Sequence, residues 1–430
     1  MKKYYDRLIE PYLMKLMRDF PAIAVDGIKG VGKTVSTKRL AASIFELDNL
    51  RDFDQVANIP DILTSEKAPI LIDEWQRIPS VWDQVRRAVD NGALPGTFLL
   101  TGSITNSNVN IHSGAGRIIR RKMYPLSLAE RDIEKPTVSI GKLLSADRPF
   151  MTNIAGKTDV SVLQYISEIE ASGLPEFRSL SSEARKIAFE SYFDNMLSHE
   201  FIQQGIRLRQ PETLLRWLRA YSAAISTDAG YMEILDASTA GEGNKPAAKT
   251  TIAYREALEK LWLLEELAPW VYGEDFFSGL KRSPKHYLAD PAFSAYFLGL
   301  DKKILAGANG WPARAERFDN KYGSILGRLF EALVYLCLCT YAGVNNAKIF
   351  FVGTHRGDRE IDFVLQKDTR VVACEAKFSP TAAPSDGKHL KWFAGQVGGD
   401  CLDMMIITTG STAYRREDGI CVVPAALLGA

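Results

Sequence analysis

The sequence has few cysteines, and none of them forms a C-x-x-C pair. Cysteine occurs five times in 430 residues, and every one lies in the last quarter of the chain. An odd number without close pairs argues against both a disulfide framework and a zinc site. The cysteines stand in apolar runs such as Val-Tyr-Leu-Cys-Leu-Cys. We therefore expect them to be small residues of the core.

The chain also lacks an excess of charge of either sign. Lysine and arginine together number 53, aspartate and glutamate number 52, and the formal net charge is +1. A protein that sheathes nucleic acid in a continuous basic surface would be far more positive. Any contact with DNA must therefore come from local patches of charge.

Long hydrophobic runs are missing as well. No uninterrupted apolar stretch reaches the length of a membrane span, and the N-terminal Met-Lys-Lys-Tyr-Tyr-Asp-Arg lacks the apolar segment of a signal peptide. We therefore expect no membrane span and a cytoplasmic location. Hydrophobic residues nevertheless make up 46% of the chain, which is typical of globular proteins. At roughly 150 residues per domain, the length predicts about three domains.

Three patterns follow one another along the chain. Up to about residue 145, short β-type runs alternate with helical stretches, which indicates a parallel sheet covered by helices. The next region is mainly helical, and the last begins with a long apolar helix followed by strands. Prolines and glycines between 132 and 160 suggest a linker or a loop-rich insert. The predicted domains are 1–145, 146–310 and 311–430.

A complete G-x-x-x-x-G-K-T motif lies between a short apolar strand and a helical segment, the context in which it binds nucleotides. Its glycines let backbone N–H groups surround phosphates, and the following helix start favours negative charge. We expect Lys33 to reach the β- and γ-phosphates of ATP and Thr34 to ligate Mg²⁺. The predicted nucleotide-binding residues are Gly27, Ile28, Lys29, Gly30, Val31, Gly32, Lys33 and Thr34.

A second apolar strand, Pro69-Ile70-Leu71-Ile72, ends in the carboxylates Asp73 and Glu74. Asp73 is placed to hold Mg²⁺ through water, as the acidic partner of a P-loop. Glu74 would polarise the attacking water as a general base, and this second carboxylate favours hydrolysis over transfer of phosphate to a metabolite. The alternative is a solvated acidic pair at a strand end.

Two later segments supply further candidates. Phe98–Ser103 is a third strand that ends in hydroxyls, and its Thr101 either senses the γ-phosphate or caps the next turn. Arg117 lies in a basic run. It is either an arginine finger that stabilises transition-state charge, in a neighbouring subunit for instance, or part of a surface cluster with no catalytic role.

These segments resemble a family of prokaryotic AAA+-type ATPases. The resemblance implies an ATPase core, then a winged-helix region, then a C-terminal domain with a restriction-endonuclease-like fold. It rests on Asp26 and the P-loop, Ile72-Asp73-Glu74-Trp75-Gln76, Leu100-Thr101-Gly102-Ser103, Ala115-Gly116-Arg117 and Tyr124-Pro125-Leu126-Ser127.

The end of the middle region has a pattern similar to a winged helix. Tyr254, Leu258 and Leu261 share one face of a predicted helix over 250–267, and a β-prone stretch follows Pro269. A helix in this position can read a DNA groove. Its polar face, however, carries glutamates that DNA phosphates would repel. Direct readout is therefore disfavoured against a role in packing or subunit contact, and both interpretations stay open.

Two apolar strands near the C-terminus carry acidic residues. If they form a hairpin centred on Asp368-Thr369, Asp362 lies directly opposite Glu375, and Lys377 shares a face with Glu375. Two carboxylates a few ångströms apart repel each other unless a cation lies between them. The sequence therefore predicts a metal site at this place.

In this prediction Asp362 and Glu375 hold Mg²⁺, Lys377 orients or activates water, and Glu331 adds a ligand from the preceding helix. The pattern resembles the PD-(D/E)xK nuclease fold, particularly its Holliday-junction-resolvase-like branch, which implies phosphodiester hydrolysis. The alternative is a nuclease-derived domain that no longer cuts, in which Lys377 only neutralises the carboxylates.

The predicted fold class is α/β, with a P-loop parallel sheet, a helical middle domain ending in a winged-helix-like region, and a nuclease-like α/β domain. One hypothesis is a Mg²⁺-dependent ATPase coupled to a domain that binds or cleaves duplex or branched DNA. The other is a nucleotide-dependent switch or scaffold whose nuclease-like domain is inactive and binds a partner. Under both hypotheses we expect a homo-oligomer.

Overall fold

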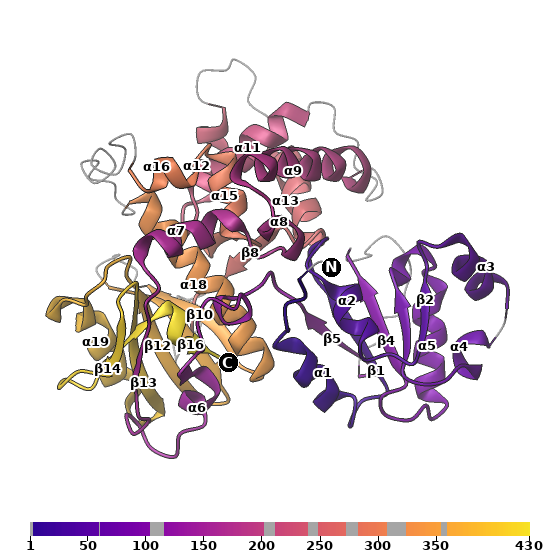
Figure 1. The fold of residues 1–430 in the computed structure, drawn as a ribbon, viewed down its shortest axis with the longest axis horizontal. Coiled ribbons are helices and arrows are strands. Elements are labelled where there is room, and N and C mark those ends of the chain that lie inside the picture. Colours follow the sequence, from indigo (N-terminus) through magenta and orange to yellow (C-terminus); the bar gives the residue numbers. More distant parts are fainter. Residues whose placement is uncertain are drawn as a thin grey trace. The chain divides into compact units, whose positions relative to one another are not determined.

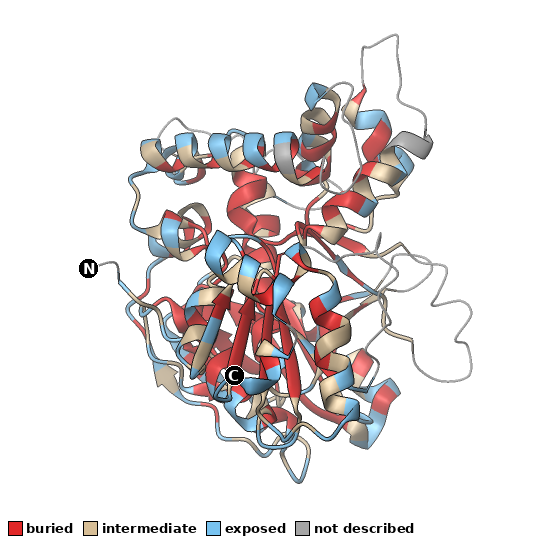
Figure 2. Ribbon diagram, turned by 90° about the vertical axis from the view of Figure 1, so that its right-hand side faces the viewer, coloured by how far each residue is buried: buried red, intermediate tan, exposed pale blue. Residues whose placement is uncertain are grey.

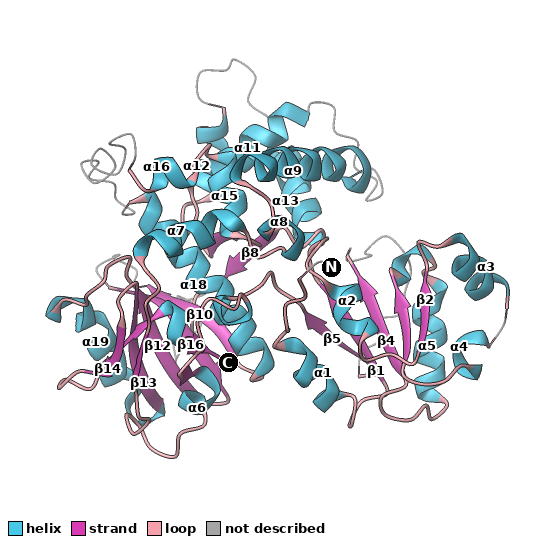
Figure 3. Ribbon diagram, viewed as in Figure 1, coloured by secondary structure: helices cyan, strands magenta, loops and turns pink. Residues whose placement is uncertain are grey.

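The computed structural model describes residues 3–59, 61–103, 116–201, 211–239, 248–271, 283–307, 324–353 and 359–430. The chain forms two compact units. The first comprises Met1–Tyr124 with Ala257–Leu263, and the second comprises Pro125–Glu256 with Leu264–Ala430. Figure 1 shows the chain coloured along its sequence, and Figure 3 shows its helices and strands.

The first unit is built on a five-stranded sheet with the strand order β2-β3-β4-β1-β5. All of its pairings are parallel, as the alternation of strands and helices predicts. Its elements are α1 (Ile9–Leu16), β1 (Ala22–Asp26), α2 (Lys33–Lys38), β2 (Ser43–Glu46), α3 (Leu50–Asn58), α4 (Ile62–Ser65), β3 (Ile70–Asp73), the short helix η1 (Trp75–Arg77), α5 (Ser80–Asp90), β4 (Phe98–Gly102) and β5 (Ile118–Lys122).

The central strands of this sheet are buried along their whole length. Every residue of β1, β3 and β4 is buried, which fits their nearly continuous apolar sequences, since helices cover both faces of a parallel sheet. On one face, Ala24 and Leu100 pack with Trp82 of α5 in a single core. Burial therefore holds the strands in place, and the polar residues that follow their carboxyl ends lie side by side along one end of the sheet.

The second unit contains a seven-stranded sheet with the order β10-β11-β12-β13-β15-β14-β7. Its four central strands, β11, β12, β13 and β15, are mostly buried, as the red strands of Figure 2 show. The helices of the unit are α6 (Ile140–Leu144), α7 (Val162–Ala171), α8 (Pro175–Arg178), α9 (Ser182–Asn195), η3 (Met196–Glu200), α11 (Pro211–Ala223), α12 (Tyr231–Ser238), α15 (Pro291–Phe297), α16 (Lys302–Leu305), α18 (Ile325–Val344) and α19 (Lys388–Val397). Its strands are β6 (Val138–Ser139), β7 (Gly156–Lys157), β8 (Leu264–Leu267), β9 (Lys285–Leu288), β10 (Lys348–Gly353), β11 (Glu360–Lys367), β12 (Arg370–Ala376), β13 (Cys401–Thr408), β14 (Thr412–Arg415), β15 (Cys421–Pro424) and β16 (Leu428–Gly429).

The segment predicted as a linker contributes strands to this second unit. β7 pairs with β14, and β6 pairs with β16 near the end of the chain. The first compact unit ends at Tyr124, so the predicted boundary near residue 145 lies inside the second unit. Strands of two residues leave no periodic pattern in a sequence, which is why the segment looked like a linker.

A helix and a two-stranded sheet occupy the region with the winged-helix pattern. Helix α13 (Ala248–Lys260) is followed by β8, which pairs with β9 in antiparallel register from Leu264↔Leu288 to Leu267↔Lys285. The residues between 272 and 282 lie outside the described part of the chain. The winged-helix assignment itself stays a prediction.

Helix α18 is the one described helix that is long and apolar enough to cross a membrane. Arg328 and Glu331 interrupt its apolar sequence, and 78% of its most apolar window is buried inside the structure. A core helix of a globular protein has the same length and composition. The cytoplasmic location stays a prediction.

Candidate nucleotide-binding site and carboxylate cluster

The phosphate loop follows β1 and leads directly into α2, as the motif requires. Gly32 precedes the helix with a φ of 104°, a backbone conformation that favours glycine. Gly27 is constrained in a second way, because a Cβ at this position would lie 2.4 Å from the carbonyl oxygen of Met123. The glycines of the motif are therefore needed for the path of the loop itself.

The Lys33 side chain lies across its own loop. Its Nζ donates hydrogen bonds to the carbonyl oxygens of Gly27, at 2.8 Å, and Ile28, at 3.1 Å, and only 4% of the residue is exposed. These carbonyls hold the ammonium group at the centre of the loop. From this position it can exchange them for the oxygens of a bound phosphate.

Thr34 and Asp73 meet where α2 faces the end of β3. The Thr34 hydroxyl donates to Asp73 Oδ1 at 2.8 Å, and the buried Thr101 hydroxyl donates to the same oxygen from β4. Burial raises the pKa of the Asp73 carboxyl, and the two hydroxyls oppose that rise. A buried carboxylate beside a hydroxyl, with no cation bonded to it among the described residues, is a donor set that fits Mg²⁺.

Glu74 occupies an unusual backbone conformation directly after β3. Its φ is 55°, in the left-handed region that residues other than glycine rarely adopt. Its Oε1 accepts a hydrogen bond from the Ser103 hydroxyl at 3.0 Å, and its Oε2 accepts one from the Gln76 amide. Both partners stand in the segments quoted for the family resemblance, but neither was predicted as a site residue, although each lies two residues beyond one that was, Thr101 or Glu74.

Thr101 has a role that neither sequence interpretation included. Its hydroxyl is fully buried and holds the Asp73 carboxylate, so in this structure it caps no turn. Two further residues were missed. Arg7 donates to the carbonyl of Val31 in the loop at 2.7 Å, and Arg120 pairs through Nε with Asp26 Oδ2 at 2.7 Å.

Arg117 lies at the amino-terminal ends of the parallel strands, whereas the phosphate loop lies at their carboxyl ends. The register of β5 against β1 runs from Ala22↔Ile118 to Asp26↔Lys122, so Arg117 lies beside the start of β1 while the loop follows its end. At about 3.3 Å per residue, the two ends of β1 are roughly 15 Å apart. Arg117 forms an ion pair with Asp90 at 2.8 Å and is half exposed. This placement argues against contact with phosphate bound in the same chain, and both a role in another copy and a surface cluster with no catalytic role stay open.

The C-terminal hairpin has the register that the sequence predicts. β11 and β12 pair from Phe363↔Cys374 to Lys367↔Arg370, with Asp368 in the turn at a φ of 55°. The next pair outward brings Asp362 and Glu375 together. The tight turn fixes this register, because the length of a hairpin loop determines which residues of the two strands face each other.

A lysine that the sequence analysis missed lies among the carboxylates. Lys285 Nζ lies 3.0 Å from Glu331 Oε1, 2.6 Å from Glu360 Oε1 and 3.2 Å from Asp362 Oδ1. The Tyr287 hydroxyl also donates to Glu331, at 2.9 Å. We call Lys285, Glu331, Glu360, Asp362, Glu375 and Lys377 the carboxylate cluster.

The other two residues of the cluster are Glu375, on β12, and Lys377, directly after that strand. Lys377 Nζ pairs with Glu375 Oε2 at 3.1 Å, while Glu375 Oε1 is buried and has no hydrogen-bond partner among the described residues. Burial raises the pKa of Glu375 to about 8 and that of Glu331 to about 7. Burial also acts to raise the pKa of Asp362, but the ammonium groups of Lys285 and Lys377 bring it below its ordinary value.

The structure brings the predicted ligands Glu331, Asp362 and Glu375 together but does not arrange them around a metal position. No group of three histidine, cysteine, aspartate or glutamate side chains in the described residues is arranged to hold a metal ion. The ammonium of Lys285 lies where the Glu331 and Asp362 oxygens converge. In this conformation the ammonium group of Lys285 fills the space that a divalent ion would need between Glu331 and Asp362, and the metal site stays a prediction.

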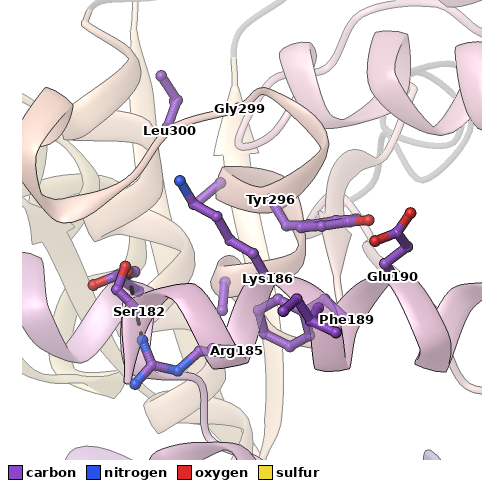
Figure 4. Close-up of a pocket in the computed structure, with 12 residues that line it drawn as sticks. Ser182, Arg185, Lys186, Phe189, Glu190, Tyr296, Gly299 and Leu300 are labelled. Atoms are coloured by element: carbon purple, nitrogen blue, oxygen red, sulfur yellow. Dashed lines mark hydrogen bonds and ion pairs between the residues drawn. The ribbon is translucent and has the colours of Figure 1, made fainter. Parts of the chain in front are cut away.

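A separate pocket of about 360 Å³ lies among α7, α9 and α15 (Figure 4). Its lining is mainly apolar and includes Phe189 and Tyr296. Its basic residues already have acidic partners: Arg185 pairs with Glu170 at 3.5 Å, and Lys186 pairs with Asp301 at 3.1 Å. These pairs engage the two basic residues of the pocket, and the carboxylate of Glu190 also lines it.

Three family models match the chain. Residues 19–131 match the family described as "AAA domain". This match and the phosphate loop together support a P-loop ATPase domain in this part of the chain. Residues 163–304 and 326–428 match two families, each described as "Domain of unknown function", numbered DUF8612 and DUF4143. The last match covers most of the carboxylate cluster, while Lys285 falls in the preceding family region.

Similar proteins include uncharacterized proteins of Mycobacterium bovis and Mycobacterium tuberculosis, each 23% identical over 423 residues, 96% of this chain and 82% of the relative. Among solved structures, the Walker-type ATPase PABY2304 of Pyrococcus abyssi matches with a TM-score of 0.37, 16% identity and coverage of 68% of this chain and 96% of that one. The Aeropyrum pernix ORC2 protein matches with a TM-score of 0.28, 15% identity and coverage of 68% and 90%.

Proposed function

We propose that the ATPase domain hydrolyses ATP in the presence of Mg²⁺. The arrangement that carries this proposal is the pair Asp73 and Glu74, two consecutive carboxylates held in different ways. Asp73 is bonded to Thr34 beside the phosphate loop, and the left-handed backbone turns Glu74 toward Ser103. One carboxylate is thus committed to a metal position, and the other remains available to water.

In this mechanism Thr34 and Asp73 would hold Mg²⁺, which neutralises phosphate charge. Lys33 turns from its backbone acceptors to the β- and γ-phosphate oxygens. Glu74 accepts a proton from the attacking water as the water oxygen bonds to the γ-phosphorus and the bond to the bridging oxygen breaks. Ser103 and Gln76 orient Glu74 for this step.

Phosphate release from ATP with Mg²⁺ tests the proposal. The variants Lys33→Ala and Glu74→Gln should each lose turnover, and Glu74→Gln should still bind nucleotide because it keeps the loop intact. Glu66→Gln is the matched control, since this exposed carboxylate contacts only Ser43 among its recorded bonds. Wild-type turnover by both site variants would refute the assignment.

We further infer that ATP hydrolysis regulates binding of a partner by the C-terminal domain, duplex or branched DNA being the first candidate. The position of Lys285 within the carboxylate cluster favours a binding role over cleavage. The placement of Arg117 away from its own nucleotide supports a homo-oligomer in which it reaches a neighbour.

Turnover measured with and without DNA, and mass by light scattering with ATP, ADP and no nucleotide, test these points. Turnover indifferent to DNA would point to a protein partner, and a constant mass would contradict nucleotide-dependent assembly.

A further inference from the structure

The carboxylate cluster receives its central cation from outside the seven-stranded sheet. Glu360 and Asp362 lie on β11 of that sheet, and Glu331 lies on α18. Lys285 comes from β9, which pairs only with β8 in a separate two-stranded sheet. A different region of the chain therefore places a positive charge where acidic residues of the C-terminal domain converge.

The contacts of this lysine are saturated. An ammonium group has three hydrogens to donate, and Lys285 has three carboxylate oxygens within 3.2 Å. The residue is 2% exposed, and its Nζ lies 5.7 Å from the centre of the Phe351 ring. Buried charges persist in proteins only when they are paired, so this geometry describes a built site for a cation.

With all of its carboxyl groups ionised, the cluster would be short of positive charge. It holds four carboxyl groups, Glu331, Glu360, Asp362 and Glu375, against two ammonium groups, and within the described part of the chain Glu375 Oε1 has no hydrogen-bond partner. A divalent ion would supply the missing positive charge. It cannot approach the facing oxygens of Glu331 and Asp362, however, while an ammonium group occupies the space that they share.

We propose that Lys285 takes the place of a divalent metal ion in the carboxylate cluster, and that its removal uncovers a latent metal site formed by Glu331, Asp362 and Glu375. The lysine thereby closes the cluster and joins the middle region of the chain to the C-terminal domain. This inference concerns only the second unit, and it holds whether or not the first unit hydrolyses ATP.

Binding of Mn²⁺ to the full chain, followed by the electron paramagnetic resonance of the free ion, tests the proposal. All proteins carry Asp73→Asn and are free of nucleotide, so that the P-loop contributes no site. The parent should bind no Mn²⁺ at the cluster. Lys285→Met should gain one ion per chain, and the added change Asp362→Asn should remove it. Lys348→Met, which alters an exposed lysine at the start of β10, should behave as the parent.

Two results would overturn the proposal. One is Mn²⁺ bound to the parent and lost on adding Asp362→Asn, because a metal would then coexist with Lys285. The other is a folded Lys285→Met protein that binds no Mn²⁺. Should Lys285→Met fail to fold, Lys285→Gln takes its place in the test. Should neither variant fold, the parent is compared with its Asp362→Asn derivative, and equal Mn²⁺ binding by these two proteins supports the displacement of the metal by Lys285.

Discussion

Replacing Thr101 with valine tests the most specific feature of the nucleotide site. The two side chains have nearly the same shape, and Thr101 is fully buried, so valine fits the space and removes only the hydroxyl. Asp73 then keeps Thr34 as its remaining hydroxyl donor. A hydrogen bond to a charged group contributes about 1.5–3 kcal/mol, so the carboxylate loses roughly that much stabilisation.

The expected loss is about 10- to 100-fold in kcat/KM for ATP, since each 1.4 kcal/mol is a factor of ten. The pH dependence has a definite sign. Burial already raises the pKa of Asp73, and the bond from Thr101 opposes that rise. Without it the carboxyl stays protonated to a higher pH, and protonation removes its ability to hold Mg²⁺. The acid limb of the kcat/KM profile should therefore move to higher pH.

Phosphate release measured across the pH range, at several Mg²⁺ concentrations, provides the assay. High Mg²⁺ should restore part of the lost activity, because the defect lies in holding the ion. Thr97→Val, just before the same strand, is the control, since its hydroxyl bonds only to the carbonyl of Leu94 among its recorded partners. A Thr101→Val enzyme with the wild-type profile would refute the role given to this hydroxyl.

Other predictions concern single contacts. Ser103→Ala removes one donor from Glu74 and should lower kcat several-fold with little change in KM, as steady-state kinetics would show; an effect confined to KM would contradict it. Arg117→Ala should lower turnover if the residue acts in a neighbouring copy, and an excess of Lys33→Ala chains, which keep Arg117, should then restore turnover; unchanged turnover would contradict a catalytic role for this residue. Arg131→Met removes one of the two arginines that pair with Glu168, the other being Arg178, and should reduce the free energy of unfolding by about 1.5–3 kcal/mol in denaturant, where a loss below about 1 kcal/mol would show the Arg131 contact to be dispensable.

The sequence was most informative where the site residues are neighbours in the chain or are brought together by one tight turn. The phosphate loop and the pair Asp73-Glu74 are short uninterrupted motifs, and their strand context is readable from apolar runs. The register that brings Asp362 to Glu375 follows from one tight turn. In each case the partners are close in the chain, so local patterning alone determines how they meet.

Features built from distant segments could not be predicted in this way. Lys285 looks like any lysine near the end of a helical region, and only the packing of β9 against α18 and β11 places it among carboxylates. Arg117 stands in a basic run that suggested an arginine finger, yet the direction of β5 places it at the end of the strands opposite to the phosphate loop. Ala115, quoted with it in the resemblance, lies outside the described residues.

The pairing of β6 and β7 with the much later strands β16 and β14 has a consequence for synthesis on the ribosome. The residues of β6 and β7 emerge directly after the ATPase domain, whereas their partners β14 and β16 are among the last strands to be made. The early strands must wait unpaired through the translation of more than half of the chain. The pairing of β6 and β7 is therefore a late step of folding, and a nascent chain arrested near residue 400 would expose the unpaired backbone groups of these two strands to chaperones.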